Sequence, residues 1–491
     1  MPQTKRITEN FKQNLTNLGF TPRIINPVKM NNVVIFSADE HIRDSSQKIK
    51  SYMPWINVQI LTDPFSASNY QSDQPTVFIF DDTAMTLVNT QRIRAYNVDA
   101  VLVLLSANEF IHCSPPAAAE AKFPYVAKAD LIFAVNHHEF LPETIITAVV
   151  RSAEDRLNIQ KYSTARRYIF LVIDDEPRWF SQFLPVLYNI IGQRADVMLT
   201  RTYEETLNFI FNLSDPSEID QQNYLSNGHG DDIVCVITDM YFPIDNKLSI
   251  KAGQAIVELI KKYFPRIPIL IASKAEEGNH YKNFAFVIPK GDSGSLQALQ
   301  EYIHDYTGMG DFIIRDEKGA IRYRVSNIHQ LLKLIIEAED NSLESKQLRK
   351  LLEKYGRKEY FSTWLYMHGF RDLGDELRPK RATGKKMLNI LKQAITAEIE
   401  RTQKSPLIIN GNRIFSLEDL LKLLRTIETD KIQFLSDNDI FSYWLDRKGF
   451  PELAEEFRPI HGAGYELTKS LADLVEKWIP IYRKRSQQSN K

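Results

Sequence analysis

Four short apolar runs in this chain each end in a polar side chain that could take part in chemistry. The runs and the residues that follow them are 170–173 with Asp174 and Asp175, 233–238 with Asp239, 267–272 with Ser273, and 286–289 with Lys290. Crowded carboxylates repel one another, and a divalent cation with oxygen ligands relieves that repulsion. The acidic residues Asp174, Asp175 and Asp239 therefore predict a Mg²⁺ site.

A carboxylate beside a metal ion and a second cation can attack a phosphoryl group and form an acyl phosphate. Asp239 is the expected nucleophile, because the metal ion would lie beside its carboxylate. Lys290 would neutralise the charge of the transferred oxygens, and Ser273 would donate a hydrogen bond to one of them. These three residues form the predicted catalytic set of a phosphoacceptor site.

These side chains can act together only if the four runs are neighbouring strands. Short runs rich in Ile, Val and Leu are typical of strands that are buried on both faces of a parallel sheet. In doubly wound sheets, ligands bind beyond the carboxyl ends of the strands. We therefore expect an α/β fold in which one sheet edge gathers the acids, the hydroxyl and the amine.

The order of these residues resembles that of bacterial response-regulator receiver domains, which have a flavodoxin-like fold. The family's acidic pair, phosphoacceptor, switch hydroxyl and lysine occur here in the same order, as Asp174 with Asp175, Asp239, Ser273 and Lys290. Pro243 follows the phosphoacceptor by four residues, as in the family. The family usually has proline after its lysine, whereas Gly291 stands here and could loosen the loop. The resemblance implies a receiver domain at 167–308 that is phosphorylated on Asp239.

Residues 31–155 carry a weaker copy of the same pattern. When the two segments are aligned, Asp82 becomes the counterpart of Asp239, and Ala38 replaces the first metal carboxylate. No lysine ends the last apolar run of this segment. We therefore predict a degenerate pseudo-receiver that holds no stable acyl phosphate and serves as a docking or dimerisation platform.

The C-terminal third of the sequence is rich in helical patterns and repeats itself. The run Phe-Ser-Thr-Trp-Leu at 361–365 returns as Phe-Ser-Tyr-Trp-Leu at 441–445, and Gly-Phe and Arg-Pro follow both runs at the same distances. We predict a mostly helical, duplicated region with modules at 311–402 and 407–482. The Phe, Trp and Leu of each run share one helical face, which predicts a role in the core.

The order of the segments also resembles the N-terminal signalling region of certain bacterial proteins related to phosphoenolpyruvate synthase and pyruvate phosphate dikinase. In those proteins a degenerate and a complete receiver precede three short motifs, found here at 310–313, 361–365 and 377–379. Their kinase and phosphohistidine parts have no counterpart in this sequence. The resemblance therefore implies a signalling function like that of the N-terminal region of those proteins, and no phosphoenolpyruvate chemistry.

The composition fits a cytoplasmic signalling protein. The 491 residues leave room for about three or four domains. A formal net charge of −1 gives no overall attraction to nucleic acid or to anionic membranes. Cys113 and Cys235 form no CxxC pattern, which indicates reduced structural thiols. The sequence shows neither a signal peptide nor an apolar span, so we expect no membrane insertion.

Together these patterns predict a response regulator of a two-component phosphorelay whose output is binding rather than catalysis. A sensor histidine kinase or a phosphotransfer protein would donate the phosphoryl group. The helical modules would bind an unidentified protein target or a second copy of the chain. Two alternatives stay open. One is a DNA-binding transcriptional regulator, which the basic stretches at 380–386 and 483–485 would permit, and the other is a phosphorylation-independent scaffold. An enzymatic output is disfavoured, because the modules carry no phosphate loop, zinc ligand set or nucleophile elbow.

Overall fold

The computed structural model divides into two compact units. The first, here called the sheet unit, contains Pro27–Asn189 and Ala195–Tyr302, and the second, the helical unit, contains Met1–Asn26, Ile190–Arg194 and Ile303–Lys491. The structure describes residues 14, 27–53, 56–62, 75–135, 142–162, 168–192, 194–219, 228–274, 285–292, 294–380, 382–427, 429–458, 460 and 462–489. Residue 167, the predicted start of the second domain, lies outside the described residues. The division into four domains stays a prediction.

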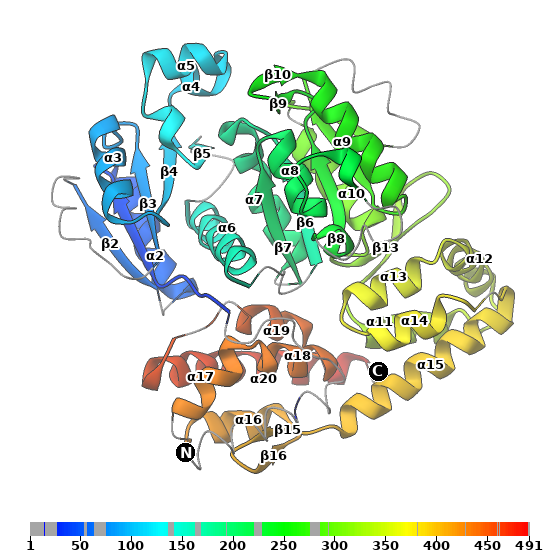
Figure 1. Ribbon diagram of the computed structural model, residues 1–491. Helices are drawn as coiled ribbons and strands as arrows, with labels where there is room; N and C mark the ends of the chain where they lie inside the picture. Colours follow the sequence, from blue (N-terminus) through cyan, green and yellow to red (C-terminus); the bar gives the residue numbers. More distant parts are fainter. Residues whose placement is uncertain are drawn as a thin grey trace. The chain divides into compact units, whose positions relative to one another are not determined.

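The sheet unit begins with a five-stranded parallel sheet, the first sheet (Figure 1, blue to cyan). Its strands are β1 (Asn32–Phe36), β2 (Asn57–Leu61), β3 (Thr76–Asp81), β4 (Val101–Ser106) and β5 (Leu131–Ala134). The helices along this segment are α2 (Glu40–Tyr52), α3 (Leu87–Tyr96), α4 (Glu109–Cys113), α5 (Pro116–Lys122), the 3₁₀ turn η2 (Val126–Lys128) and α6 (Pro142–Tyr162). The strand order β2-β1-β3-β4-β5 is that of flavodoxin-like doubly wound sheets.

The second sheet has the same order, β7-β6-β8-β11-β12, and is also parallel. Its strands are β6 (Tyr168–Ile173), β7 (Ala195–Thr200), β8 (Ile233–Thr238), β11 (Ile269–Ser273) and β12 (Phe286–Pro289). Its helices are α7 (Pro177–Ile191), α8 (Tyr203–Phe211), α9 (Ile250–Tyr263) and α10 (Ser295–Tyr306), with 3₁₀ turns η3 (Pro216–Glu218) and η4 (Gly230–Asp232). The four apolar runs are thus confirmed as strands of one parallel sheet.

A small hairpin follows β8 and leads into α9. It consists of β9 (Phe242–Ile244) and β10 (Lys247–Ser249), which pair in antiparallel fashion. The two turn residues, Asp245 and Asn246, have φ of 51° and 60°. Positive φ at both positions suits a tight two-residue hairpin, and Asn and Asp tolerate this conformation.

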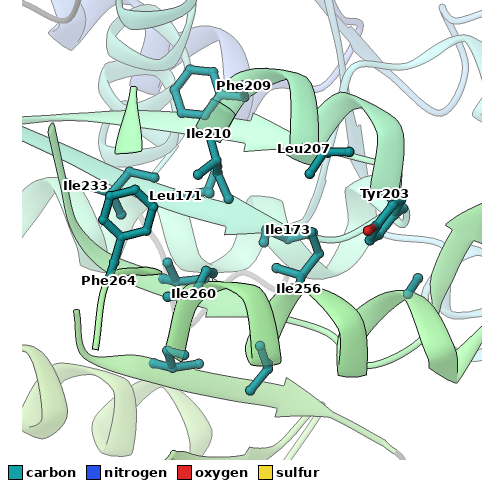
Figure 2. Close-up of a cluster of buried hydrophobic side chains, with 14 of the residues drawn as sticks. Leu171, Ile173, Tyr203, Leu207, Phe209, Ile210, Ile233, Ile256, Ile260 and Phe264 are labelled. Atoms are coloured by element: carbon teal, nitrogen blue, oxygen red, sulfur yellow. The ribbon is translucent and has the colours of Figure 1, made fainter. Parts of the chain in front are cut away.

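Branched and aromatic side chains form the core that holds the second sheet against α8 and α9. Figure 2 shows the apolar side chains of the strands directed toward those of the two helices, with Leu171, Ile173 and Ile233 from the sheet, Leu207 and Ile210 from α8, and Ile256 and Ile260 from α9. Each of these side chains is at most 5% exposed. The sheet is therefore fixed on this face by dense apolar packing, which holds its carboxyl edge in place.

Helix α6 joins the two sheets through buried polar side chains. Asp155, which is fully buried, accepts hydrogen bonds from the Tyr188 hydroxyl at 2.8 Å and from the Val197 amide at 2.9 Å. On the other side, Asn158 accepts from the amide of Val28 at 2.7 Å. Because buried polar groups that lose a partner are costly, these contacts tie α6 to the second sheet and to the segment before β1.

The helical unit contains two segments with the same order of elements. The first has β13 (Phe312–Arg315), β14 (Ile321–Val325), α11 (Ile328–Glu337), α12 (Leu343–Arg357), α13 (Tyr360–Met367), α14 (Arg371–Leu377) and α15 (Gly384–Lys404). The second has β15 (Leu407–Ile409), β16 (Asn412–Ile414), α16 (Leu417–Leu424), α17 (Asp430–Asp437), α18 (Ile440–Arg447), α19 (Pro451–Phe457) and α20 (Gly464–Ser489). Among the described helices, none has both the length and the apolar character needed to cross a bilayer.

The repeated aromatic motif lies in the core of each segment, as predicted. Trp364 of α13 and Trp444 of α18 are each 1% exposed. Trp364 packs edge-on against Phe312, with ring centroids 6.0 Å apart, and its Nε1 donates a hydrogen bond to the Gly310 carbonyl at 3.0 Å. Gly369, with φ of 83°, follows α13 and turns the chain into α14, a conformation that favours glycine.

We expect Trp364→Ala to destabilise the helical unit by about 3–5 kcal/mol, because it leaves a large cavity and an unpaired carbonyl. Urea unfolding followed by circular dichroism measures this change. Tyr465→Ala is the control, since this side chain is 70% exposed and its loss should shift stability by less than about 0.5 kcal/mol. Equal unfolding midpoints for the two variants would contradict the core role of the motif.

Candidate functional site

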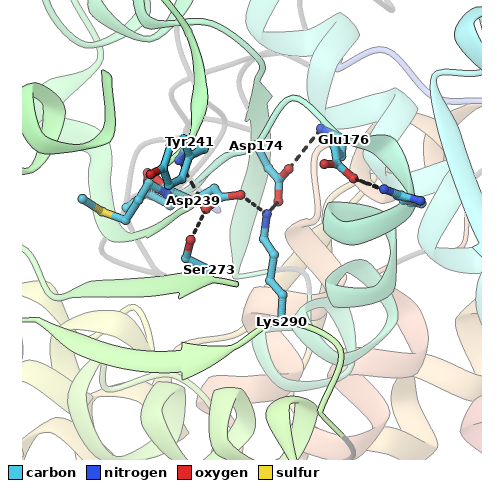
Figure 3. Close-up of polar contacts among 9 residues, drawn as sticks. Asp174, Glu176, Asp239, Tyr241, Ser273 and Lys290 are labelled. Atoms are coloured by element: carbon cyan, nitrogen blue, oxygen red, sulfur yellow. Dashed lines mark hydrogen bonds and ion pairs between the residues drawn. The ribbon is translucent and has the colours of Figure 1, made fainter. Parts of the chain in front are cut away.

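Four of the predicted site residues meet at the carboxyl edge of the second sheet (Figure 3). Lys290 Nζ lies 2.6 Å from Asp174 Oδ2 and also forms an ion pair with Asp239 Oδ2. The side chains of Lys290 and Asp174 are each 2% exposed, and that of Asp239 is 13% exposed. One buried amine is therefore shared by two carboxylates.

The strand order explains why these residues meet. β8 lies between β6 and β11, and Ile173 pairs with Thr238 in the β6–β8 ladder. The next residues of the two strands are therefore neighbours, and they are Asp174 and Asp239. On the other side of β8, Ser273 is the last residue of β11.

Asp239 is the centre of the hydrogen-bond network. Its Oδ1 accepts from Ser273 Oγ at 2.5 Å and from the backbone amides of Met240 at 2.5 Å and Tyr241 at 3.4 Å, while its Oδ2 contacts Lys290. One oxygen thus faces neutral donors and the other faces a cation. Both carboxylate oxygens of Asp239 therefore have hydrogen-bond donors in the described contacts.

Burial makes the acidic pair costly to ionise. It raises the pKa of Asp174 to about 7, since desolvation and the charge of Asp239 together outweigh the attraction of Lys290. Burial likewise raises the pKa of Asp175 to about 6, with Glu176 and Asp239 adding repulsion. The pKa of Lys290 is raised, because the attraction of Asp174 and Asp239 exceeds the cost of burying the amine. The site therefore holds more potential negative charge than one lysine offsets.

Asp175 stands apart from the other predicted residues. It follows Asp174 in the loop between β6 and α7 and feels the charge of Lys290, yet it forms no ion pair with the lysine in the described part of the chain. Within the described ranges, no group of three or more His, Cys, Asp or Glu side chains has the arrangement of a formed metal site. The predicted Mg²⁺ ligation by Asp174, Asp175 and Asp239 stays a prediction.

Gly291 adopts a backbone conformation that proline cannot take. Its φ is 84°, whereas the proline ring fixes φ near −65°. Glycine in place of the usual proline therefore suits the turn that follows Lys290. The space beside this turn is filled by Trp179, whose ring would lie 3.4 Å from an added Cβ at Gly291.

The first sheet carries a different arrangement at the equivalent edge. Phe36 of β1 pairs with Phe80 of β3, so the next residues, Ser37 and Asp81, occupy the places that Asp174 and Asp239 hold in the second sheet. The alignment that made Asp82 the counterpart of Asp239 is therefore wrong by one residue. The reason is that β3 continues through Asp81 before the chain turns.

Asp81 is satisfied by neutral donors alone in the described contacts. It accepts hydrogen bonds from the Ser37 hydroxyl at 2.6 Å, from the Thr83 hydroxyl at 2.6 Å and from three backbone amides. Burial would raise the pKa of Asp81, but these hydrogen bonds hold it below its ordinary value. Ser106 pairs with Ala134 in the first sheet, as Ser273 pairs with Pro289 in the second. The residue after Ala134, buried Val135, therefore takes the place that Lys290 holds after Pro289. Among the described residues, this edge therefore has no counterpart of the Lys290 amine.

Sequence reasoning missed Glu176 and Arg178, which connect the site to the first sheet. The Glu176 amide donates to Asp174 Oδ1 at 3.0 Å, and its carboxylate binds the Arg178 guanidinium at 2.7 Å (Figure 3). Arg178 is 7% exposed and donates to the carbonyls of Ile111, His112 and Ser114 at the end of α4. The only sequence signal was the position of an arginine four residues after Asp174, which says nothing of its partners.

No protein-family model matches this chain, and no curated protein sequence matches it. Solved structures similar to it include two proteins described as a putative and a probable two-component system response regulator/GGDEF domain protein. They are each 15% identical, with TM-scores of 0.29 and 0.27, and cover 56% and 55% of this chain and 99% and 96% of their own. A putative sugar binding protein from Salmonella typhimurium LT2 has a TM-score of 0.19 at 12% identity, over 62% of this chain and 97% of its own.

We expect Arg178→Ala to loosen α4 from the second sheet at a cost of about 1.5–3 kcal/mol, because it leaves carbonyls and Glu176 without their charged donor. Hydrogen exchange at residues 109–114 measures the effect and should become faster. The control is Arg92→Ala, which removes an exposed arginine of α3 and should leave exchange in α4 unchanged. Unchanged protection of α4 in Arg178→Ala would refute this connection.

Proposed function

We propose that the second sheet accepts a phosphoryl group on Asp239 and that the chain acts as a response regulator of a two-component phosphorelay. The observation that supports this best is the single Lys290 ammonium shared by two buried carboxylates, Asp174 and Asp239. The two carboxylates carry more potential negative charge than the one amine offsets. An excess of buried acid suits a site that receives a further cation and then an anionic group.

The residues fit a Mg²⁺ ion. The carboxylates of Asp174, Asp175 and Asp239 are hard oxygen ligands, and the raised pKa values of the first two reflect a repulsion that a bound cation would relieve. When bound, Mg²⁺ would orient the phosphoryl oxygens and offset their charge.

The chain's own residues carry the proposed transfer. An Asp239 carboxylate oxygen forms a bond to phosphorus, while the bond between phosphorus and the histidine nitrogen of a kinase or phosphotransfer protein breaks. Lys290 already contacts Asp239 Oδ2, so a small shift of Nζ lets it bind a phosphoryl oxygen. Ser273 Oγ, which donates a hydrogen bond to Asp239 Oδ1, would donate to a second phosphoryl oxygen instead. Both moves keep charged groups paired at a largely buried edge, where such pairing is strongest.

The modification then acts as a switch for binding. It adds about 1.5 to 2 negative charges if the acyl phosphate behaves like other phosphorylated side chains. To convert a mostly inactive population into a mostly active one, the two states must differ in phosphoryl affinity by about 5.5 kcal/mol. We propose that Ser273 carries the change into the chain after β11 and that the output is altered contact of the helical unit with a protein target or a second copy.

The other candidate functions receive less support. Some of the basic residues proposed for DNA contact form ion pairs with acids of the helical unit, for example Lys380 with Glu376 at 2.5 Å and Arg483 with Glu418 at 2.7 Å. A phosphorylation-independent docking role suits the first sheet, whose Asp81 has no lysine partner in the described contacts. We therefore propose a cytoplasmic signalling protein in which the first sheet docks, the second is phosphorylated, and no enzymatic output is required.

Asp239→Asn should abolish phosphoryl labelling by acetyl phosphate with Mg²⁺, because the amide has no nucleophilic oxygen anion. Intact-protein mass spectrometry measures the added phosphoryl group. Asp81→Asn and Asp82→Asn are matched controls from the first sheet and should label as the unmodified protein does. Labelling that persists in Asp239→Asn would place the acceptor elsewhere.

Mg²⁺ should bind at least about tenfold more tightly at pH 7.5 than at pH 5.5. The carboxyl pKa values of about 7 for Asp174 and about 6 for Asp175 mean that both groups lose their protons as the pH rises through this window, and the metal binds only the ionised form. Isothermal titration calorimetry of the full chain measures the affinity. Asp174→Asn should weaken binding at pH 7.5 and flatten its pH dependence, and a pH-independent affinity in the unmodified protein would argue against these ligands.

A further inference from the structure

A cavity of about 180 Å³ lies in the sheet unit. The first sheet contributes Asp130 and Leu131 to its wall, α6 contributes Arg156, and the segment after β7 contributes Arg201 and Glu205. Its lining thus comes from both sheets and from the helix that joins them.

Two arginines, Arg156 and Arg201, lie in this wall. Arg201 donates to the carbonyl of Asp130 at 2.8 Å and lies over the ring of Phe180, 5.5 Å from its centroid. Arg156 has a buried Nε with no hydrogen-bond partner among the described residues. Neither guanidinium forms an ion pair with a carboxylate in the part of the chain that the structure describes.

The acids near the cavity are already engaged. Asp130 forms an ion pair with Arg94 and accepts from the Leu102 amide at 2.8 Å. Glu205 accepts from the backbone amide of Arg201 at 2.7 Å. With three arginines and two acids around this point, one positive charge is left over. Burial lowers the pKa of Arg201, and the charges of Arg156 and Arg94 lower it further, although Asp130 and Glu205 oppose this.

The size of the cavity restricts what it can hold. Pockets for drug-sized ligands have roughly 300–1,000 Å³, so this one is too small for a nucleotide. A single water needs only about 10–15 Å³, so the cavity is far larger than one water. Guanidinium groups bind oxyanions with paired N–H donors, which would also supply the acceptor that Arg156 Nε lacks.

We propose that this cavity binds a small oxyanion of the size of phosphate, held by Arg156 and Arg201. Because both sheets and α6 line the site, an anion there links their mutual packing to ligand concentration. The ligand can be inorganic phosphate or the phosphate end of a small phosphomonoester, since both present the same oxygens. This site is independent of phosphorylation on Asp239.

Calorimetry with the full chain tests the proposal, with inorganic phosphate and glycerol phosphate as probes. We expect at least one of the two probes to bind saturably. Chloride at equal ionic strength should show no such binding. Arg156→Gln should weaken it at least tenfold, and Arg43→Gln, which removes an exposed arginine of α2, should leave it unchanged. Asp239→Asn should also bind normally, which separates this site from the phosphoacceptor. Tighter binding of glycerol phosphate would assign the site to phosphomonoesters, and tighter binding of inorganic phosphate would assign it to the free ion.

Hydrogen exchange provides a second readout that does not depend on a variant. Phosphate should protect residues 130–131, 152–160 and 197–201 in the unmodified protein, since these segments line the cavity. Retained phosphoryl labelling on Asp239 would show that Arg156→Gln is folded. The proposal is overturned if neither probe binds, if Arg156→Gln binds as tightly as the unmodified protein, or if protection appears only around the Asp239 edge.

Discussion

The site at the carboxyl edge of the second sheet depends on one buried amine between two carboxylates. Lys290 lies at the end of an edge strand, and it reaches Asp174 and Asp239 only because β6, β8, β11 and β12 are parallel and adjacent in this order. Moving any one of these strands by a single residue would turn its terminal side chain to the other face of the sheet. The dense core under α8 and α9 therefore holds the geometry of the proposed phosphoacceptor site as well as the fold.

The first sheet shows what the same topology does without the amine. Its strand order is identical, yet Asp81 is satisfied by hydroxyl and amide donors and Val135 fills the place of the lysine. Hydrogen bonds from these donors stabilise the ionised carboxylate of Asp81. The two sheets thus share a strand order but differ in the described side chains at their carboxyl edges.

Much of this site could be predicted from the sequence, because apolar runs and their terminal polar residues are local signals. The runs before Asp174 and Asp239 form strands, and parallel pairing brings their ends together. Placing Met85 opposite Phe242 makes Asp82 the counterpart of Asp239, whereas β3 continues through Asp81, and a run of two acids does not show where a strand ends. The contacts of Arg178 could not be predicted, since its partners lie more than sixty residues away in the chain. Nor does the sequence show that Gly291 has a positive φ.

The most direct test of the central claim is to locate the acyl phosphate itself. After incubation with acetyl phosphate and Mg²⁺, reduction with borohydride converts a phosphorylated aspartate to homoserine, which peptide mass spectrometry can place. We predict homoserine at position 239 and at neither of the first-sheet acids, Asp81 and Asp82. Homoserine at another position, or none under conditions in which the intact protein carries a phosphoryl group, would contradict this account.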